Sequence, residues 1–111
     1  MTQVELFDEF KRDFKRLAKK FRTLPEELEE LITALEISPE QGTDLGSGLR
    51  KIRLGSKSKG GGKSGGFRVI TYYIEKIGDD EIVYLVTIYD KSEFNTIKKN
   101  DLMKIIQDAL G

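Results

Sequence analysis

The side chains that could carry out chemistry in this sequence are mostly basic, and they are concentrated in one stretch. Residues 49–68 contain seven Lys or Arg and no Asp or Glu, whereas residues 24–48 contain seven acidic residues and no basic one. The balance of 19 basic against 19 acidic side chains therefore conceals blocks of opposite charge. Such a block attracts polyanions locally, whatever the net charge. The alternative is a solvated basic surface balanced by a neighbouring acidic helix.

The chain contains no His and no Cys, which restricts its chemistry. It lacks the commonest general base and metal ligand, and it has no disulfide, zinc thiolate or thiol nucleophile. Catalysis would depend on carboxylates, Lys, Arg, Tyr or a cofactor. No apolar run reaches the roughly 20 residues of a membrane span, and the N-terminus is unlike a signal peptide. We therefore expect a cytoplasmic protein with no membrane partner and a single domain over residues 1–111.

Residues 55–66 consist only of Gly, Ser and Lys. This composition predicts a flexible basic loop. Gly62-Lys63-Ser64 matches the end of a P-loop, but Lys57 stands where the first glycine should be, and the segment precedes a strand rather than a helix. Nucleotide binding is therefore not expected. Two interpretations remain open, a soluble linker or a basic loop whose amides and lysines bind phosphates.

The spacing of apolar residues predicts two N-terminal helices joined by a tight turn. Phe and Leu recur at steps of three and four over residues 7–21, and the outer face of this helix is rich in Lys and Arg. Thr23 can cap the second helix, which ends at Ser38-Pro39 because the residue before a proline avoids the helical region. A C-terminal helix is also predicted, with Asn100 as its cap.

Strands are predicted between the second and the last helix. Residues 51–54 alternate charged and apolar side chains, and residues 67–75 and 81–89 are rich in Val, Ile, Thr and aromatic residues. Residues 42–48 are predicted to be a loop, and residues 3–6 to be either an edge strand or the lead-in to the first helix. The sequence therefore predicts an α+β fold, with a helical hairpin on a small antiparallel sheet and a C-terminal helix on the same face.

Strand alternation also predicts which polar side chains share a surface. The face opposite the helices is expected to gather Lys51, Arg53, Arg68, Tyr89 and Lys91. A basic surface edged by aromatic residues suits the backbone of a single-stranded nucleic acid.

Several stretches of the sequence occur together in one known family. They are Gly48-Leu49-Arg50-Lys51-Ile52-Arg53, Gly62-Lys63-Ser64-Gly65-Gly66-Phe67-Arg68-Val69-Ile70-Thr71-Tyr72-Tyr73 and Ile88-Tyr89-Asp90-Lys91-Ser92-Glu93. With this spacing the chain resembles the RelE/ParE superfamily, and within it the HigB-like RelE toxins of bacterial type II toxin–antitoxin modules. The resemblance extends over nearly the whole chain.

This resemblance implies an α+β toxin domain of the RelE-like microbial RNase fold. It implies an mRNA endonuclease that cleaves codons in the ribosomal A site, inhibits translation and leaves a 2′,3′-cyclic phosphate. It also implies neutralisation by a cognate antitoxin, expected to be a helix-turn-helix protein, and no metal or other cofactor. The expected partners are therefore the antitoxin, the ribosome and mRNA.

The resemblance also suggests roles for individual residues. Arg68 matches the family arginine that stabilises transition-state charge. Lys51 and Arg53 match a basic pair on the preceding strand, and Lys91 matches a lysine just after the last strand. We expect RNA contacts from Lys51, Arg53 and Lys57. The candidate catalytic residues are Arg68, Lys59, Lys63, Tyr89 and Lys91.

The sequence departs from the best-known RelE pattern at two places. Ser92 stands where that pattern has a second arginine, and Ile97-Lys98 lie where it has a terminal stacking tyrosine. Tyr89, a lysine or ribosomal RNA would then supply the missing group. Two alternative functions remain, a ParE-like inhibitor of DNA gyrase that does not cut RNA, and a catalytically degenerate domain that only binds the antitoxin.

Overall fold

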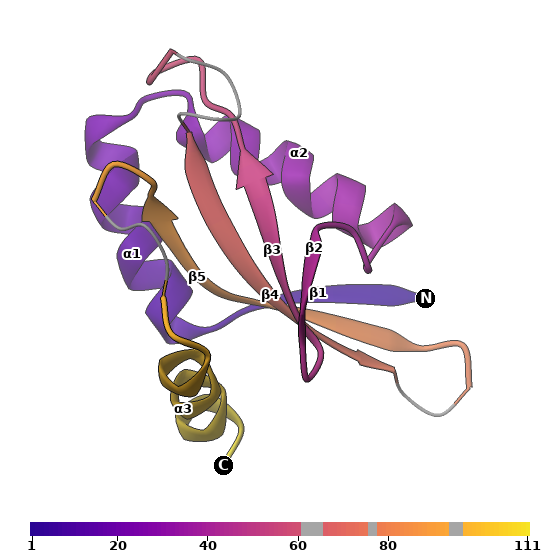
Figure 1. The fold of residues 1–111 in the computed structure, drawn as a ribbon. Helices are drawn as coiled ribbons and strands as arrows, with labels where there is room; N and C mark the ends of the chain where they lie inside the picture. The colour runs from indigo at the N-terminus through magenta and orange to yellow at the C-terminus, as the bar shows by residue number, and fades with distance from the viewer. Residues whose placement is uncertain (61–65, 76–77, 94–96) are drawn as a thin grey trace.

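The computed structural model describes residues 1–60, 66–75, 78–93 and 97–111. Within these residues, helices and strands follow one another in an α+β order (Figure 1). The elements are β1 (Thr2–Leu6), α1 (Asp8–Lys20), α2 (Leu24–Ile37), β2 (Thr43–Gly46), β3 (Leu49–Leu54), β4 (Phe67–Glu75), β5 (Glu81–Asp90) and α3 (Lys99–Leu110). The predicted helices, their short connection and the three predicted strands are confirmed.

The described strands form one five-stranded sheet in the order β1-β5-β4-β3-β2. Neighbouring strands are antiparallel except β1, which runs parallel to β5. The α+β class is confirmed, and residues 3–6 belong to an edge strand. The expectation of a wholly antiparallel sheet is wrong at this edge, because most of the chain separates β1 from β5 and no hairpin fixes their relative direction.

The prediction of a loop over residues 42–48 is also wrong, because this segment contains β2. The strand is short and has a bulge between Asp44 and Gly46. At the bulge, the Asp44 carboxylate accepts a hydrogen bond from the Gly46 N–H (2.7 Å), which is typical turn chemistry. No alternation marks such a strand in the sequence, and its pairing with β3 determines its conformation.

α1 and α2 cover one face of the sheet (Figure 1). Their buried side chains pack on Ile52, Val69 and Leu85 of the central strands, among others. The helical members of this core are Phe10, Leu17, Leu24, Leu28, Leu31 and Leu35. The periodic apolar stripe of each helix is thus the surface that anchors it to the sheet.

α3 packs on the opposite face of the sheet, so the prediction that all helices share one face is wrong. Leu102 and Ile106 of α3 belong to a second core cluster with Leu49, Ile70 and Val86. The central strands are apolar on both faces, and the periodicity of a helix does not specify which apolar face it covers.

Two predicted helix caps are wrong in detail. Thr23 precedes α2 but makes no capping hydrogen bond with its side chain. Its hydroxyl lies 2.6 Å from that of Ser58, in the loop after β3. α3 begins at Lys99, after Lys98 at the N-cap position rather than Asn100. For Thr23, this tertiary contact with Ser58 outweighs the local capping preference, which contributes only about 1 kcal/mol.

Candidate nucleic-acid interface

A row of three polar residues crosses the central strands β3, β4 and β5 near one end of each strand. Arg53 of β3 is opposite Arg68 of β4, and Arg68 is opposite Tyr89 of β5. Lys51 lies two residues before Arg53. Its partner on β4 is Ile70, which belongs to the second core cluster, called here the α3-side core because it contains Leu102 and Ile106 of α3. Since side chains two residues apart share a face and lie about 7 Å apart, these polar groups form one surface on the α3 side of the sheet. The structure thus brings together four of the five residues predicted to share it.

The members of this surface differ in depth. Arg68 and Tyr89 are only 5% and 2% exposed, whereas Lys51 is half-buried and Arg53 is exposed. One guanidinium N–H of Arg68 donates to the carbonyl of Phe67 (3.1 Å). Burial raises the pKa of Tyr89 although the charge of Arg68 opposes this rise, so the hydroxyl keeps its proton at neutral pH. Arg53 and Lys51 are therefore the outer cations, and Arg68 and Tyr89 form the floor beneath them.

Lys91 lies just beyond β5 and is exposed. Its backbone N–H donates to the carbonyl of Gly66 (3.3 Å), immediately before β4. A Cβ at Gly66 would lie 2.2 Å from the carbonyl oxygen of Leu54, so only glycine allows the chain to pass this closely. The end of β5 is thus held beside the start of β4, and Lys91 comes from the turn next to the Arg68–Tyr89 pair.

The loop lysines occupy different environments. Lys57 has an exposed side chain, while its backbone N–H donates to the buried carboxylate of Glu27 (2.8 Å). Lys59 instead forms an ion pair with Asp90 and is largely buried. Lys63 lies outside the described residues. The described part of the loop is therefore attached to α2 and β5, and Lys57 is the lysine in it that presents its side chain to solvent.

One basic residue of this face was missed by the sequence reasoning. Lys99, in the first turn of α3, brings its ammonium to within 3.0 Å of the position that a Cβ on Gly46 would occupy. It therefore reaches from α3 to the end of β2, which is the strand paired with the Lys51-bearing strand β3. The adjacent lysines 98 and 99 were visible as a basic pair, but no sequence pattern placed α3 on this face.

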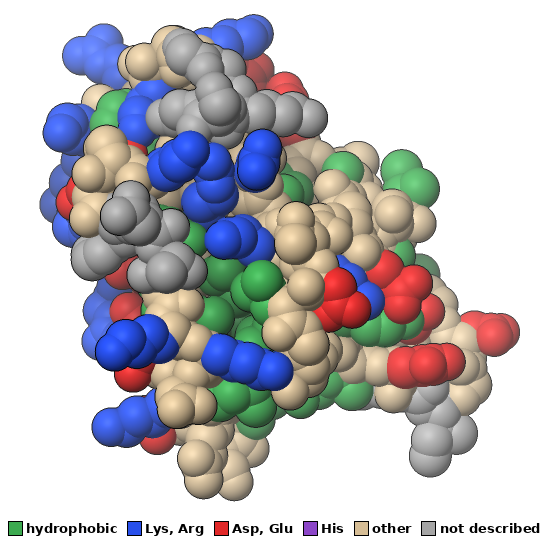
Figure 2. Space-filling model, viewed as in Figure 1, with side chains coloured by type: hydrophobic (Ala, Val, Ile, Leu, Met, Phe, Trp, Pro, Cys, Tyr) green, Lys and Arg blue, Asp and Glu red, His purple; other side chains and the backbone are tan. Residues whose placement is uncertain are grey.

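The surface view shows the charge separation in space. Lys and Arg side chains gather over the ends of β3 and β4 that face the connecting loop, whereas Asp and Glu side chains gather on the other side of the same view (Figure 2). A patch of apolar side chains lies between this basic cluster and further Lys or Arg side chains near α3 (Figure 2). Cations that flank an apolar patch can hold phosphates on either side of a base.

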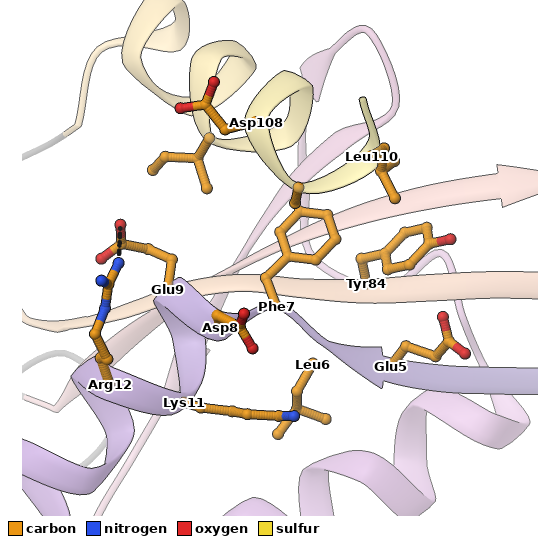
Figure 3. A pocket seen from close by; sticks show the side chains of 12 residues that line it. Glu5, Leu6, Phe7, Asp8, Glu9, Lys11, Arg12, Tyr84, Asp108 and Leu110 are labelled. Carbon is orange, nitrogen blue, oxygen red and sulfur yellow. Dashed lines mark hydrogen bonds and ion pairs between the residues drawn. The ribbon is translucent and has the colours of Figure 1, made fainter.

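A hollow of about 880 Å³ lies elsewhere, between the start of α1 and the end of α3 (Figure 3). The ring of Phe7 lies against that of Tyr84 on its floor, with 4.9 Å between the ring centres. Its charged lining is mainly acidic, since Lys11 and Arg12 are outnumbered by Glu5, Asp8, Glu9 and Asp108. A polyanion would be repelled there, so this hollow is a poor candidate for the chemistry that the basic face offers.

Two kinds of feature are absent from the described part of the chain. No group of three or more carboxylates lies close enough together there to hold a metal ion. No helix there is sufficiently long and apolar to cross a membrane.

The family comparison agrees with this architecture. The family model described as the RelE toxin of the RelE/RelB toxin–antitoxin system matches residues 9–109, which leaves only a few residues unmatched at either end. Membership of such a system implies a cognate antitoxin as a partner. Strands β2 to β5, the arginine row and nearly all of the three helices lie within the matched range, whereas β1 precedes it. The chain therefore belongs to the RelE toxin family.

Proposed function

We propose that this toxin is a ribosome-dependent, metal-independent mRNA endonuclease of the HigB-like branch, which cleaves codons in the A site and so inhibits translation in the cytoplasm. The observation that carries the proposal is the row of Arg53, Arg68 and Tyr89, with Lys51 beside it, on one face of the sheet. Two arginines directly opposite each other destabilise a sheet. Their repulsion is relieved when a phosphate lies between them.

The proposed reaction is an internal transfer at one phosphodiester. A base removes the proton of the ribose 2′-OH, the 2′ oxygen bonds to phosphorus, and the bond from phosphorus to the 5′ oxygen breaks. An acid returns a proton to that oxygen, which leaves a 2′,3′-cyclic phosphate and a 5′-hydroxyl end. The crowded phosphorane carries extra negative charge, which arginine and lysine side chains can stabilise in place of a metal.

The depth of each side chain suggests its role. Arg53, Lys51 and Lys57 are assigned to the phosphates that flank the scissile bond, because their side chains are at or near the surface. Arg68 is assigned to the transition-state charge, since it lies directly beside Arg53 in the row. Lys91, which is exposed beside the row, is assigned as the acid that gives a proton to the leaving 5′ oxygen.

Tyr89 is assigned to the floor of the site. Because its pKa is raised, its hydroxyl acts as a hydrogen-bond donor rather than as a base at neutral pH. Its aromatic ring belongs to the α3-side core. It therefore contributes to the orientation of the neighbouring Arg68 and to the shape of the surface on which RNA lies.

Primer extension on mRNA from cells that express the toxin tests this proposal. We expect breaks in phase with codons for the wild type, and none for Arg68→Ala, which should fold and still bind antitoxin. Arg12→Ala is the matched control, because it removes an exposed arginine from α1 and should leave cleavage unchanged. Growth arrest without mRNA breaks but with inhibited gyrase would instead support a ParE-like function. Antitoxin binding with neither effect would support a degenerate domain.

We further propose that the antitoxin is a helix-turn-helix protein encoded beside the toxin gene. The match to a two-component toxin–antitoxin system supports the presence of an antitoxin, and its fold and gene position are the proposal. Co-expression of the neighbouring gene should restore growth, and the two proteins should co-purify. A neighbour that restores growth but has no helix-turn-helix fold would contradict this part of the proposal.

A further inference from the structure

Lys59 and Asp90 form the most deeply buried ion pair in the described residues. Their side chains are 13% and 6% exposed, and both members of every other described ion pair are more exposed than this. Burying two charges is costly unless they pair closely and form further hydrogen bonds. The pair is thus a specific structural feature and not an incidental surface contact.

Aromatic rings and hydrogen bonds enclose this pair. The Lys59 ammonium lies 5.4 Å from the centre of the Phe67 ring and 5.9 Å from that of Phe21, within the range of cation–π attraction. Asp90 also accepts hydrogen bonds from the backbone N–H (2.9 Å) and hydroxyl (2.8 Å) of Ser92. Burial would raise the pKa of Asp90, but the bonds from Lys59 and Ser92 outweigh it and lower the pKa. The carboxylate therefore stays ionised.

The pair joins segments that are distant in the sequence. On the loop side, the Lys59 backbone N–H donates to the Ser56 carbonyl (3.2 Å). Ser58 and Thr23 form two reciprocal hydrogen bonds. The Thr23 backbone N–H donates to the Ser58 hydroxyl (2.7 Å), and the Ser58 backbone N–H donates to the Thr23 hydroxyl (3.0 Å). The loop after β3 is thereby attached to the α1–α2 junction, and Lys59 attaches it to the end of β5 as well.

The proposed catalytic groups lie directly beside this connection. Asp90 is the last residue of β5, with Tyr89 before it in the strand and Lys91 directly after the strand. On β4, Phe67, whose ring faces the ammonium, precedes Arg68 and is the register partner of Asp90. A shift of the pair would therefore move residues of both strands that carry the proposed chemistry.

We propose that Lys59 and Asp90 are positioning residues, which hold Arg68 and Lys91 at the spacing that the scissile phosphate requires. The inference rests on the proposed endonuclease function. It also changes the expectation for Lys59, whose ammonium is already engaged by Asp90 and by two aromatic rings. Lys59 then acts through the neighbouring strands rather than by contact with RNA.

Single-turnover cleavage on ribosomes programmed with a defined codon tests this role. Lys59→Met keeps an unbranched apolar stem between the rings and removes the charge, whereas Lys59→Arg keeps the charge. Lys57→Met is the matched control, since Lys57 lies in the same loop with an exposed side chain. We expect Lys59→Met to slow cleavage at saturating toxin by about ten- to a hundredfold. Its affinity for ribosomes that carry a 2′-O-methylated, uncleavable mRNA should change by a smaller factor than the cleavage rate. Lys59→Arg should recover most of the rate, and Lys57→Met should weaken binding more than it slows cleavage.

A readout independent of catalysis separates failure of this inference from failure of the proposed function. Amide hydrogen exchange at residues 89–93 should accelerate in Lys59→Met and stay unchanged in Lys57→Met. If the wild type cuts no mRNA, the endonuclease proposal fails, whatever the exchange shows. If the wild type cuts and Lys59→Met cuts equally fast, or exchange at these amides is unaffected, the positioning role is wrong. The positioning role would also be wrong if Lys59→Arg loses cleavage as completely as Lys59→Met. That result would indicate that Lys59 itself transfers a proton.

Discussion

Arg53 and Arg68 are register partners on the antiparallel strands β3 and β4. Like charges in directly opposed positions destabilise a sheet by roughly 0.2–1 kcal/mol, and nothing in the core requires an arginine at the exposed position 53. A local conflict of this kind is expected where function, rather than stability, determines the residue.

The opposed arginines predict a trade-off between stability and activity. Arg53→Thr removes the repulsion and introduces a good strand former, so the free energy of unfolding should rise by about 0.5 kcal/mol. RNA cleavage should fall because an outer cation is lost. Urea unfolding and primer extension measure the two effects. Arg53→Lys is the control and should keep both the repulsion and most of the activity, whereas a less stable Arg53→Thr would contradict this explanation.

The reach of Lys99 from α3 predicts a second contact for the RNA backbone. Lys99→Ala should weaken binding of an uncleavable single-stranded mRNA analogue, and the slope of log K against log salt should fall by about 0.7 for one lost phosphate contact. Lys104→Ala removes an exposed lysine further along the same helix and should leave the slope unchanged. Equal slopes for the two variants would show that Lys99 acts only through general charge.

The buried carboxylate of Asp90 predicts a pH-dependent contribution to stability. Its pKa in the folded state lies below the ordinary 3.8, so its stabilisation is complete above that value and is lost as the pH falls through the folded-state pKa. Asp90→Asn should cost about 3 kcal/mol at neutral pH, because it leaves Lys59 buried without its counter-ion. Urea unfolding at a series of pH values should show the wild type and the variant converging in acid. A difference that persists at low pH would mean that packing, not charge, is responsible.

Asp13 of α1 predicts the opposite trend. Burial raises its pKa above 3.8, although the hydrogen bond from the Thr87 hydroxyl (2.7 Å) opposes this. The folded state therefore favours the protonated form, and the resulting stabilisation is lost as the pH rises through the folded-state pKa. Asp13→Asn can keep the bond from Thr87, so it should melt at a higher temperature than the wild type at neutral pH and lose that advantage in acid. The control variant is Asp8→Asn, which removes an exposed acid near the start of the same helix. Because the negative charge of Asp8 interacts favourably with the helix dipole, this variant should lower the melting temperature slightly.

The close approach at Gly66 predicts a strong effect of one added methyl group. Gly66→Ala places Cβ against the Leu54 carbonyl, and the strand ends must separate, at a cost of about 3 kcal/mol. Gly60→Ala, in the same loop, meets no atom within 4 Å but has a φ of +70°, so it should cost only about 1 kcal/mol. Chemical denaturation compares the two variants, and similar costs would show that the strand ends adapt without strain.

The sequence determined the elements of this protein and the residue types of its site. Apolar residues at steps of three and four predicted the helices, and alternation of charged and apolar residues predicted β3, because these patterns reflect local geometries of period 3.6 and 2. Runs of β-branched and aromatic residues predicted β4 and β5. Alternation within a strand also predicted that Lys51 and Arg53 share a face. The basic block of residues 49–68, which contains no Asp or Glu, indicated a polyanionic binding partner.

Only the tertiary structure decided which face α3 covers, that residues 43–46 pair as a strand, and how deeply each basic side chain lies. The sequence placed Lys57 and Lys59 in the same basic loop and offered both as site residues, yet one is exposed and the other is paired with Asp90 near two aromatic rings. The physical reason is that burial and ion pairing depend on residues brought together from distant segments, 31 positions apart for Lys59 and Asp90. Local patterns carry no information about such contacts, so the sequence alone did not predict that Lys59 is held in a buried ion pair.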